Sequence, residues 1–321
     1  MSVWLAPLAL GLDRLVGDPD WLWRRLPHPV AGFGALIALA DRWGNRPHWP
    51  NRGRRLAGVA SILVLLALAA LLGALLHGLF RPLGWPGLAV EAVLASVFLA
   101  QKSLIDHVAR VATALEGEGL AAGRRAVSMI VGRDPAALDE AGVSRAAIES
   151  LAENASDGVV APLFFLLLFG LPGLLAYKML NTADSMIGHL DERHRAFGWA
   201  AARLDDVANW IPARLTAGLF AVAAWILLGR ASASRAARAA LADGSRHRSP
   251  NAGWPEAAAA GALDLALGGP RRYGELAVEA PFLHGSGRRA AEPADIRRGL
   301  RLFRRVCDLL LGLTLVLALT L

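Results

Sequence analysis

LAGVASILVLLALAALLGALLHGLF, residues 56–80, is the stretch that decides the fold, because its 25 residues include no formally charged side chain. As a helix rising about 1.5 Å per residue, it would reach roughly 37 Å, enough to cross a hydrocarbon core about 30 Å thick with some tilt. It begins too late in the chain and is too long to be a secretory signal peptide. We therefore expect a transmembrane helix here.

Further apolar runs are candidates for membrane-embedded helices at residues 86–100, 159–177, 215–229 and 306–321. Together with residues 56–80, they predict an all-α, polytopic integral membrane protein with about four to five membrane-embedded helices. We expect amphipathic cytoplasmic helices between them, and a single membrane-embedded catalytic domain over residues 1–321.

The run at 159–177 is interrupted by Gly170-Leu171-Pro172-Gly173. Glycine and proline in a short apolar run favour a break. The 11 residues before it, 159–169, would make only about 17 Å of helix. A re-entrant or bent hairpin is therefore an alternative to a full span.

The net charge of +7 comes almost entirely from arginine, since Lys102 and Lys178 are the only lysines. Arginine-rich segments at 13–55, 102–157 and 230–305 are typical of cytoplasmic loops of membrane proteins. No basic stripe interleaved with aromatic residues is present, so we expect no nucleic-acid partner. The single cysteine, Cys307, excludes an intrachain disulfide and a cysteine metal cluster.

Carboxylates and carboxamides bracket the run at 159–177. They are Glu149, Glu153, Asn154 and Asp157 ahead of it, Asn181, Asp184, Asp205, Asp206 and Asn209 behind it, with the hydroxyls of Thr182 and Ser185. Such groups beside apolar sequence are costly to desolvate and often mark function. Their oxygens suit Mg²⁺ and, through it, a phosphate substrate. On a helix Glu149, Glu153 and Asp157 would share one face, and a solvated helix face is the alternative interpretation.

Full spans at 159–177 and 215–229 would place the acids before and after the first run in opposite compartments. One shared site requires both runs to be re-entrant, or a cavity at membrane depth. We prefer a shared site that is reached from the cytoplasm.

Other candidates lie outside the bracket. Arg203 and Arg214 could pair with the acids or bind phosphate. Asp18 lies in an Asp-Pro sequence, where an ordinary turn explains it as well as a function does. His28 lies between prolines, where a histidine is more often a capped loop residue than a ligand, and Asn251 lies in a loop near Gly253.

A set of motifs in one order resembles a known family. The motifs are Gly17-Asp18-Pro19, His28-Pro29-Val30, Glu149–Gly158 with Ala161-Pro162, Asn181–Gly188, Phe197-Gly198, Arg203–Asn209 with Pro212-Ala213-Arg214, and Ser249–Gly253 with Gly268-Gly269. They are similar to those of adenosylcobinamide-phosphate synthase, an integral-membrane enzyme family of cobalamin biosynthesis. The chain departs from that pattern at His189, where the family has an aromatic residue, and at His194, where it has a tyrosine.

The resemblance implies an ATP-dependent ligase that joins adenosylcobyric acid to (R)-1-aminopropan-2-ol or its O-phosphate. It implies ATP and Mg²⁺ as cofactors, a multi-pass protein of the bacterial inner membrane with its active site facing the cytoplasm, and corrinoid, aminopropanol-type and lipid partners. A homo-oligomer, or contact with other corrinoid-pathway enzymes, is a further expectation.

The roles it implies are as follows. Catalytic residues are Glu153, Asp184, Arg203 and Arg214; metal ligands are Asp157, Asp184, Asp205 and Asp206; substrate or nucleotide ligands are Asp18, His28, Asn154, Asn181, Thr182, Ser185, Asn209 and Asn251. In this scheme Glu153 takes the proton from the attacking ammonium, and the arginines stabilise the transferring phosphoryl group. No P-loop is present.

Two alternatives remain. A Mg²⁺-dependent membrane phosphotransferase or prenyltransferase acting on a lipid would use similar acids, but it would not explain the loop motifs at 249–269. A transporter would line an ion path with acids, although this chain has few long apolar runs and large hydrophilic regions.

Overall fold

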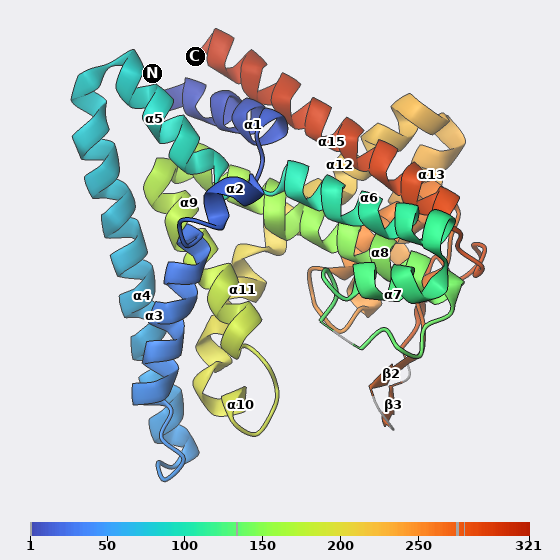
Figure 1. Cartoon of the computed structure of the whole chain (residues 1–321), viewed down its shortest axis with the longest axis horizontal. Coiled ribbons are helices and arrows are strands. Elements are labelled where there is room, and N and C mark those ends of the chain that lie inside the picture. Colours follow the sequence, from blue (N-terminus) through green and yellow to red (C-terminus); the bar gives the residue numbers. More distant parts are fainter. Residues whose placement is uncertain (1, 133, 274–275, 279) are drawn as a thin grey trace. The chain divides into compact units, whose positions relative to one another are not determined.

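The computed structural model describes residues 2–132, 134–273, 276–278 and 280–321 and is largely helical (Figure 1). The chain divides into two compact units. Unit 1 comprises Met1–Ala100, Ala161–Asn209 and Thr314–Leu321, and unit 2 comprises Gln101–Val160 and Trp210–Leu313. The prediction of an all-α architecture is confirmed, since the strands are at most three residues long.

The helices of unit 1 are η1 (Ser2–Trp4), α1 (Leu5–Leu15), α2 (Asp20–Trp23), α3 (Pro29–Gly44), α4 (Asn51–Phe80), η2 (Arg81–Leu83), α5 (Trp85–Ser96), α9 (Ala161–Ile187), α10 (His194–Phe197) and α11 (Trp199–Ala208). Those of unit 2 are α6 (Gln101–Glu118), α7 (Leu120–Val127), α8 (Glu140–Ala155), the π-helical turn η3 (Ser156–Val160), α12 (Trp210–Leu228), α13 (Arg230–Asp243), η4 (Gly244–Arg246) and α14 (Gly253–Leu263). α15 (Pro293–Thr320) belongs to both units.

Among the residues that the structure describes, four helical stretches are long and apolar enough to cross a membrane. They are Asn51–Leu83, Trp85–Glu118, Glu140–Ile187 and Trp210–Leu228. The first contains the apolar run at 56–80, so the helix predicted there is confirmed, and the four stretches agree with the expected four to five. The run at 306–321 lies in α15, which is not one of the four.

The predicted break in the run at 159–177 is present, and it reverses the chain. Gly170 has φ +65° and ψ −155°, a conformation that needs glycine. The rings of Phe165 and Tyr177 stack with centroids 5.0 Å apart, although twelve residues of straight helix would separate them by about 18 Å. A Cβ on Gly173 would lie 2.6 Å from the carbonyl oxygen of Phe165. α9 is therefore a helical hairpin, as the hairpin alternative predicted.

Unit 1 is organised by the packing of α4 against α9, which also contacts α3 and α11 (Figure 1). The tip of the hairpin approaches α4 so closely that a Cβ on Gly73 would lie 2.5 Å from the Cα of Pro172. Further along α4, a Cβ on Gly58 would lie 1.9 Å from the carbonyl oxygen of Phe197. Glycines in α4 thus fix where the hairpin and the junction between α10 and α11 pack.

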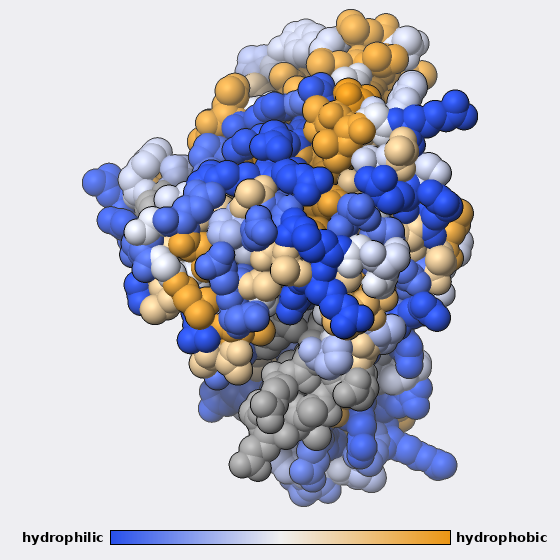
Figure 2. All heavy atoms as spheres, turned by 90° about the vertical axis from the view of Figure 1, so that its right-hand side faces the viewer, coloured by the Kyte–Doolittle hydropathy of each residue, from blue (hydrophilic) through white to orange (hydrophobic). Residues whose placement is uncertain are grey.

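Unit 2 has a core built around α14, whose alanines are buried against α12 and α13. Two short antiparallel pairs follow: β1 (Leu267–Gly268) with β4 (Phe282–Leu283), and β2 (Arg271–Tyr273) with β3 (Leu276–Val278). The face shown in Figure 2 is largely hydrophilic, with apolar side chains gathered toward its upper part.

Candidate active site

The second arm of the α9 hairpin and α11 bring acid and amide side chains together in unit 1. Asn209, at the end of α11, accepts a hydrogen bond from the Tyr177 hydroxyl at 2.9 Å and donates one to Asp205 Oδ2 at 2.9 Å. Tyr177, Asp205 and Asn209 are buried, with exposed fractions of 2%, 8% and 1%. This chain of hydrogen bonds fixes the Asp205 carboxylate inside the unit.

Other predicted residues lie around this carboxylate. Asp184 and Asp206 interact electrostatically with Asp205, and Asn181 stabilises its ionised form by hydrogen bonding. We refer to Asn181, Asp184, Asp205, Asp206 and Asn209 as the α9–α11 cluster. The sequence predicted all five as site residues, and the structure brings them together.

The charge state of α11 reflects this environment. Burial, added to the negative charge of Asp184, raises the pKa of Asp205 to about 7, although hydrogen bonds from Asn209 and Asn181 oppose the shift. Burial also raises the pKa of Asp206, while Arg203, 3.3 Å away, favours the charged form. Burial and mutual repulsion thus disfavour the ionised form of these carboxyl groups, and a bound cation would favour it.

Within the described residues, the α9–α11 cluster offers carboxylate oxygens to a cation but not a full set of protein ligands. Oδ1 of Asp205 is buried and makes no hydrogen bond within the described part of the chain. No group of three His, Cys, Asp or Glu side chains among those residues is arranged to hold a metal. Mg²⁺ commonly uses one or two carboxylates and completes its shell with water and substrate phosphates.

The hydroxyls predicted beside Asp184 are engaged with their own helix. Thr182 Oγ1 donates to the carbonyl of Lys178 at 2.7 Å, and Ser185 Oγ donates to that of Asn181 at 2.9 Å. Each hydroxyl can still accept a hydrogen bond. Gly188 lets Asp184 fold back, because a Cβ there would lie 2.0 Å from Asp184 Oδ1.

The acids before the apolar run lie in unit 2 and occupy different environments. Glu149 is buried and accepts a hydrogen bond from the backbone N–H of Gly268 at 2.7 Å, whereas Glu153 is exposed. Asn154 donates to the carbonyl of Ser150. The expected helical face is interrupted before Asp157, which lies in the π-helical turn η3. Such turns are frequent at functional sites.

Arg214 is held between two tryptophans. Its guanidinium lies 4.1 Å from the ring centroid of Trp210 and 4.3 Å from that of Trp254. It donates to the Trp210 carbonyl at 2.7 Å and approaches Asn251 Oδ1 at 3.5 Å. Two predicted residues of unit 2, Arg214 and Asn251, are therefore neighbours, and α12 also packs against η3.

Asp18 and His28 come together near the N-terminus, in unit 1. His28 Nε2 lies 3.5 Å from Asp18 Oδ1, and the ring packs on Trp23 with centroids 4.5 Å apart. His28 Nδ1 accepts a hydrogen bond from the N–H of Val30 and so caps α3. His28 therefore has a structural role as a helix cap, and its predicted role in binding stays a prediction.

The sequence did not indicate several residues that shape these sites. Tyr177 is the last residue of the apolar run at 159–177, and its hydroxyl is the one feature in the sequence that could have indicated a buried hydrogen bond there. Trp210 and Trp254 flank the motifs around Arg214 and Asn251. His194 stands where the family pattern has a tyrosine. Its Nδ1 lies 3.0 Å from Asp191 Oδ2, and its Nε2 lies 3.7 Å from Oδ1 of the buried Asp41.

Known proteins of one family are similar to this chain over nearly its whole length. The family model described as CobD/Cbib protein matches residues 6–303. Relatives named cobalamin biosynthesis protein CobD include one from Sinorhizobium sp, 57% identical over 97% of this chain and 96% of the relative. Those from Brucella suis biovar 1 and Rhodobacter capsulatus are 52% and 48% identical, each over 97% of this chain and 95% of the relative. No solved structure matches.

Proposed function

Because the chain belongs to the CobD/Cbib family of adenosylcobinamide-phosphate synthases and has a role in cobalamin biosynthesis, we propose that it is an ATP-dependent amide ligase. Its substrates would be adenosylcobyric acid and (R)-1-aminopropan-2-ol O-phosphate, or the free amino alcohol. The observation that carries this proposal is the α9–α11 cluster, where a buried acid–amide chain would offer oxygen ligands to a metal ion that in turn binds a phosphate.

The proposed reaction proceeds in two transfers. The substrate carboxylate attacks the γ-phosphorus of ATP, ADP leaves, and an acyl phosphate forms. The amine then attacks the acyl carbon, the C–O bond to phosphate breaks, and the ammonium loses a proton. The products are an amide, ADP and phosphate.

The chain's own residues have separate roles in this scheme. Mg²⁺ would be held in unit 1 by Asp184, Asp205 and Asp206. Asp157, which lies in unit 2, is proposed as a further metal ligand. Mg²⁺, when bound, would neutralise the charge of the phosphates. Asn209 and Tyr177 position Asp205 through their hydrogen bonds.

The arginines and Glu153 are assigned by their surroundings. Arg214 is oriented by its two tryptophans, so its charge can be directed at a phosphoryl group. Arg203 is exposed beside Asp206 and can reorient toward a phosphate. Glu153, also exposed, is accessible to an incoming amine and could accept its proton.

We place the protein in the bacterial inner membrane with its active site facing the cytoplasm. The arginine-rich segments outside the apolar stretches support this orientation. The α9 hairpin supports it too, because antiparallel arms return the chain to the side from which it entered.

The test uses the purified full chain with ATP, Mg²⁺, adenosylcobyric acid and the amine, with and without its phosphate. ADP and an adenosylcobinamide product should appear together. Asp205→Asn and Asp184→Asn should each lower turnover by at least about 100-fold, while Glu118→Gln, which changes an exposed carboxylate in unit 2, should not. Wild-type turnover of lipid diphosphates without an amide product would instead favour the phosphotransferase alternative.

A further inference from the structure

A recess with an excess of positive charge lies in unit 1, away from the residues assigned above. It has a volume of about 230 Å³ and is formed by the first turns of α4 and by the segment that leads from α10 into α11. Three arginines line it: Arg52, Arg55 and Arg195. Glu192 is the one carboxylate among its lining residues, which leaves a net charge of about +2 at neutral pH.

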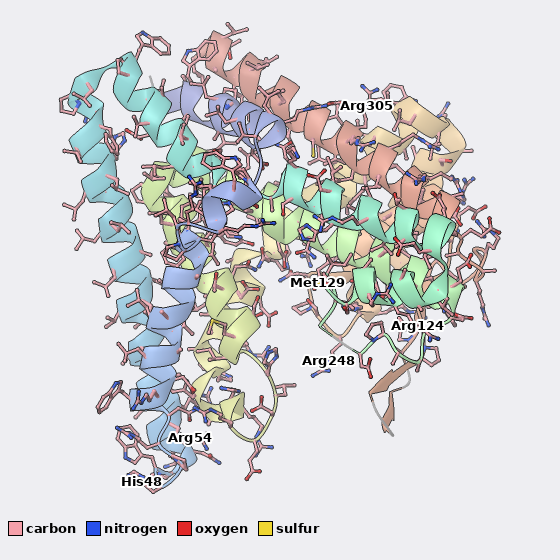
Figure 3. All side chains as sticks on the ribbon, in the orientation of Figure 1. His48, Arg54, Arg124, Met129, Arg248 and Arg305 are labelled. Atoms are coloured by element: carbon pink, nitrogen blue, oxygen red, sulfur yellow. The ribbon has the colours of Figure 1, made fainter. Side chains whose placement is uncertain are left out.

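Over the described ranges, none of the three arginine side chains is paired with a carboxylate. No acidic oxygen there lies within 4 Å of their guanidinium nitrogens, and no hydrogen bond within those ranges engages the guanidinium groups. Arg54, labelled at the N-terminal end of α4 in Figure 3, behaves differently: it donates to Asn45 Oδ1 at 2.6 Å and to the carbonyl of Arg193. In the first turns of α4, Arg54 therefore makes structural hydrogen bonds, whereas Arg52 and Arg55 line the recess.

Trp199 forms one wall of the recess and holds the side chain of Arg55 in place. The Arg55 guanidinium lies 3.6 Å from the centroid of the Trp199 ring, a stacking distance. Stacking leaves the edge of a guanidinium free to donate several hydrogen bonds, the geometry that suits phosphate oxygens. Like charges gathered without carboxylates repel one another, so an anion in the recess would relieve that repulsion.

The position of the recess along the chain indicates which phosphates can reach it. Arg52 and Arg55 directly precede the apolar run at 56–80, at the depth where lipid headgroups meet water. Trp199 begins α11, which carries Asp205 and Asp206 about 10 Å further along the helix. Both a lipid headgroup and a soluble phosphate ester could therefore supply the same chemical group.

We propose that Arg52, Arg55 and Arg195, with Trp199 as a stacking wall, form a binding site for a phosphate ester. The site does not depend on the ligase reaction proposed above. Each guanidinium contributes through charge-assisted hydrogen bonds, and Glu192 weakens the site by its opposing charge.

The test measures ligand-dependent thermal stabilisation of the purified full chain in detergent. One arm adds dioleoylphosphatidylglycerol, with dioleoylphosphatidylcholine, which is zwitterionic and has no net charge, as the reference, and the other adds inorganic phosphate. Loss of one guanidinium should weaken binding about fivefold, so Arg52→Ala, Arg55→Ala and Arg195→Ala should each do so. Arg42→Ala removes an exposed arginine of α3 that does not line the recess, and it should leave the affinity unchanged.

Each outcome decides the proposal. Stabilisation by phosphatidylglycerol alone identifies a lipid headgroup, and stabilisation by inorganic phosphate, with or without the lipid effect, indicates that the site accepts a soluble phosphate group. Glu192→Gln keeps the arginines and should tighten binding about fivefold, so it tests the site even if an arginine variant fails to fold. No binding of either probe to the wild type, equal loss in Arg42→Ala, or no tightening in Glu192→Gln would overturn the proposal.

Discussion

Replacing Tyr177 with phenylalanine should destabilise unit 1 and disturb the α9–α11 cluster. The substitution removes only the hydroxyl, so the ring can remain stacked on Phe165 at 5.0 Å. It deletes the 2.9 Å hydrogen bond to Asn209 Oδ1. Because Asn209 is only 1% exposed, water cannot readily replace that donor.

The expected magnitude follows from the burial of the acceptor. A neutral hydrogen bond contributes about 1 kcal/mol net, and a buried acceptor left without a donor costs about 1–3 kcal/mol. We therefore expect a loss of about 2 kcal/mol, which is a fall in Tm of roughly 3 °C for a chain of 321 residues. Turnover should also fall, because Asn209 is the residue that donates to Asp205.

A double-mutant cycle with Asn209→Ala separates this hydrogen bond from general loosening. Unfolding of the wild type, both single variants and the double variant would be measured in the same detergent. In the Asn209→Ala background, Tyr177→Phe should cost at least about 1 kcal/mol less than in the wild type. Energies that add within about 0.5 kcal/mol would refute the reasoning.

Three further substitutions, each compared with a milder control variant, test the packing that positions the sites. Gly198→Ala should prevent stable folding, because its Cβ would lie 1.6 Å from a backbone oxygen of α9; Gly32→Ala, with nothing within 4 Å, should change stability by less than about 1 kcal/mol, as thermal unfolding would show. Glu149→Ala should cost about 1.5–3 kcal/mol by removing a charged acceptor from the N–H of β1, and Glu149→Gln should cost less in the same unfolding assay. Trp254→Ala should raise the KM for ATP if Arg214 binds phosphate, and Trp254→Phe, which keeps an aromatic face, should restore most of the affinity.

The membrane helices could be predicted because the cost of burying charge in lipid depends on local sequence. The uncharged run at 56–80 was sufficient to predict α4. The reversal at Gly170 was also local, since a positive φ and a proline two residues later both act on neighbouring backbone. The choice between a span and a hairpin still needed the contact between Phe165 and Tyr177.

The partners inside the sites could not be predicted, because they depend on how helices pack. Adjacent residues on a helix point about 100° apart, so Asp205 is buried and Asp206 half-buried only because of how α11 lies on α9. The sequence predicted both acids as metal ligands and did not distinguish the buried one from the half-buried one. Glu149 was predicted as part of an acidic face, but its partner, Gly268, lies 119 residues later.

The contact between Gly73 and Pro172 has a consequence for how the protein is made. The first arm of the hairpin, residues 161–169, is too short to stay in a bilayer as an independent helix. α4 leaves the ribosome well before it, so a membrane-anchored helix already offers a glycine-lined surface when the hairpin emerges. We expect insertion of the hairpin to wait for that surface, and a bulky residue at position 73 would then act during biogenesis, leaving the hairpin outside the membrane and exposed to quality-control proteases.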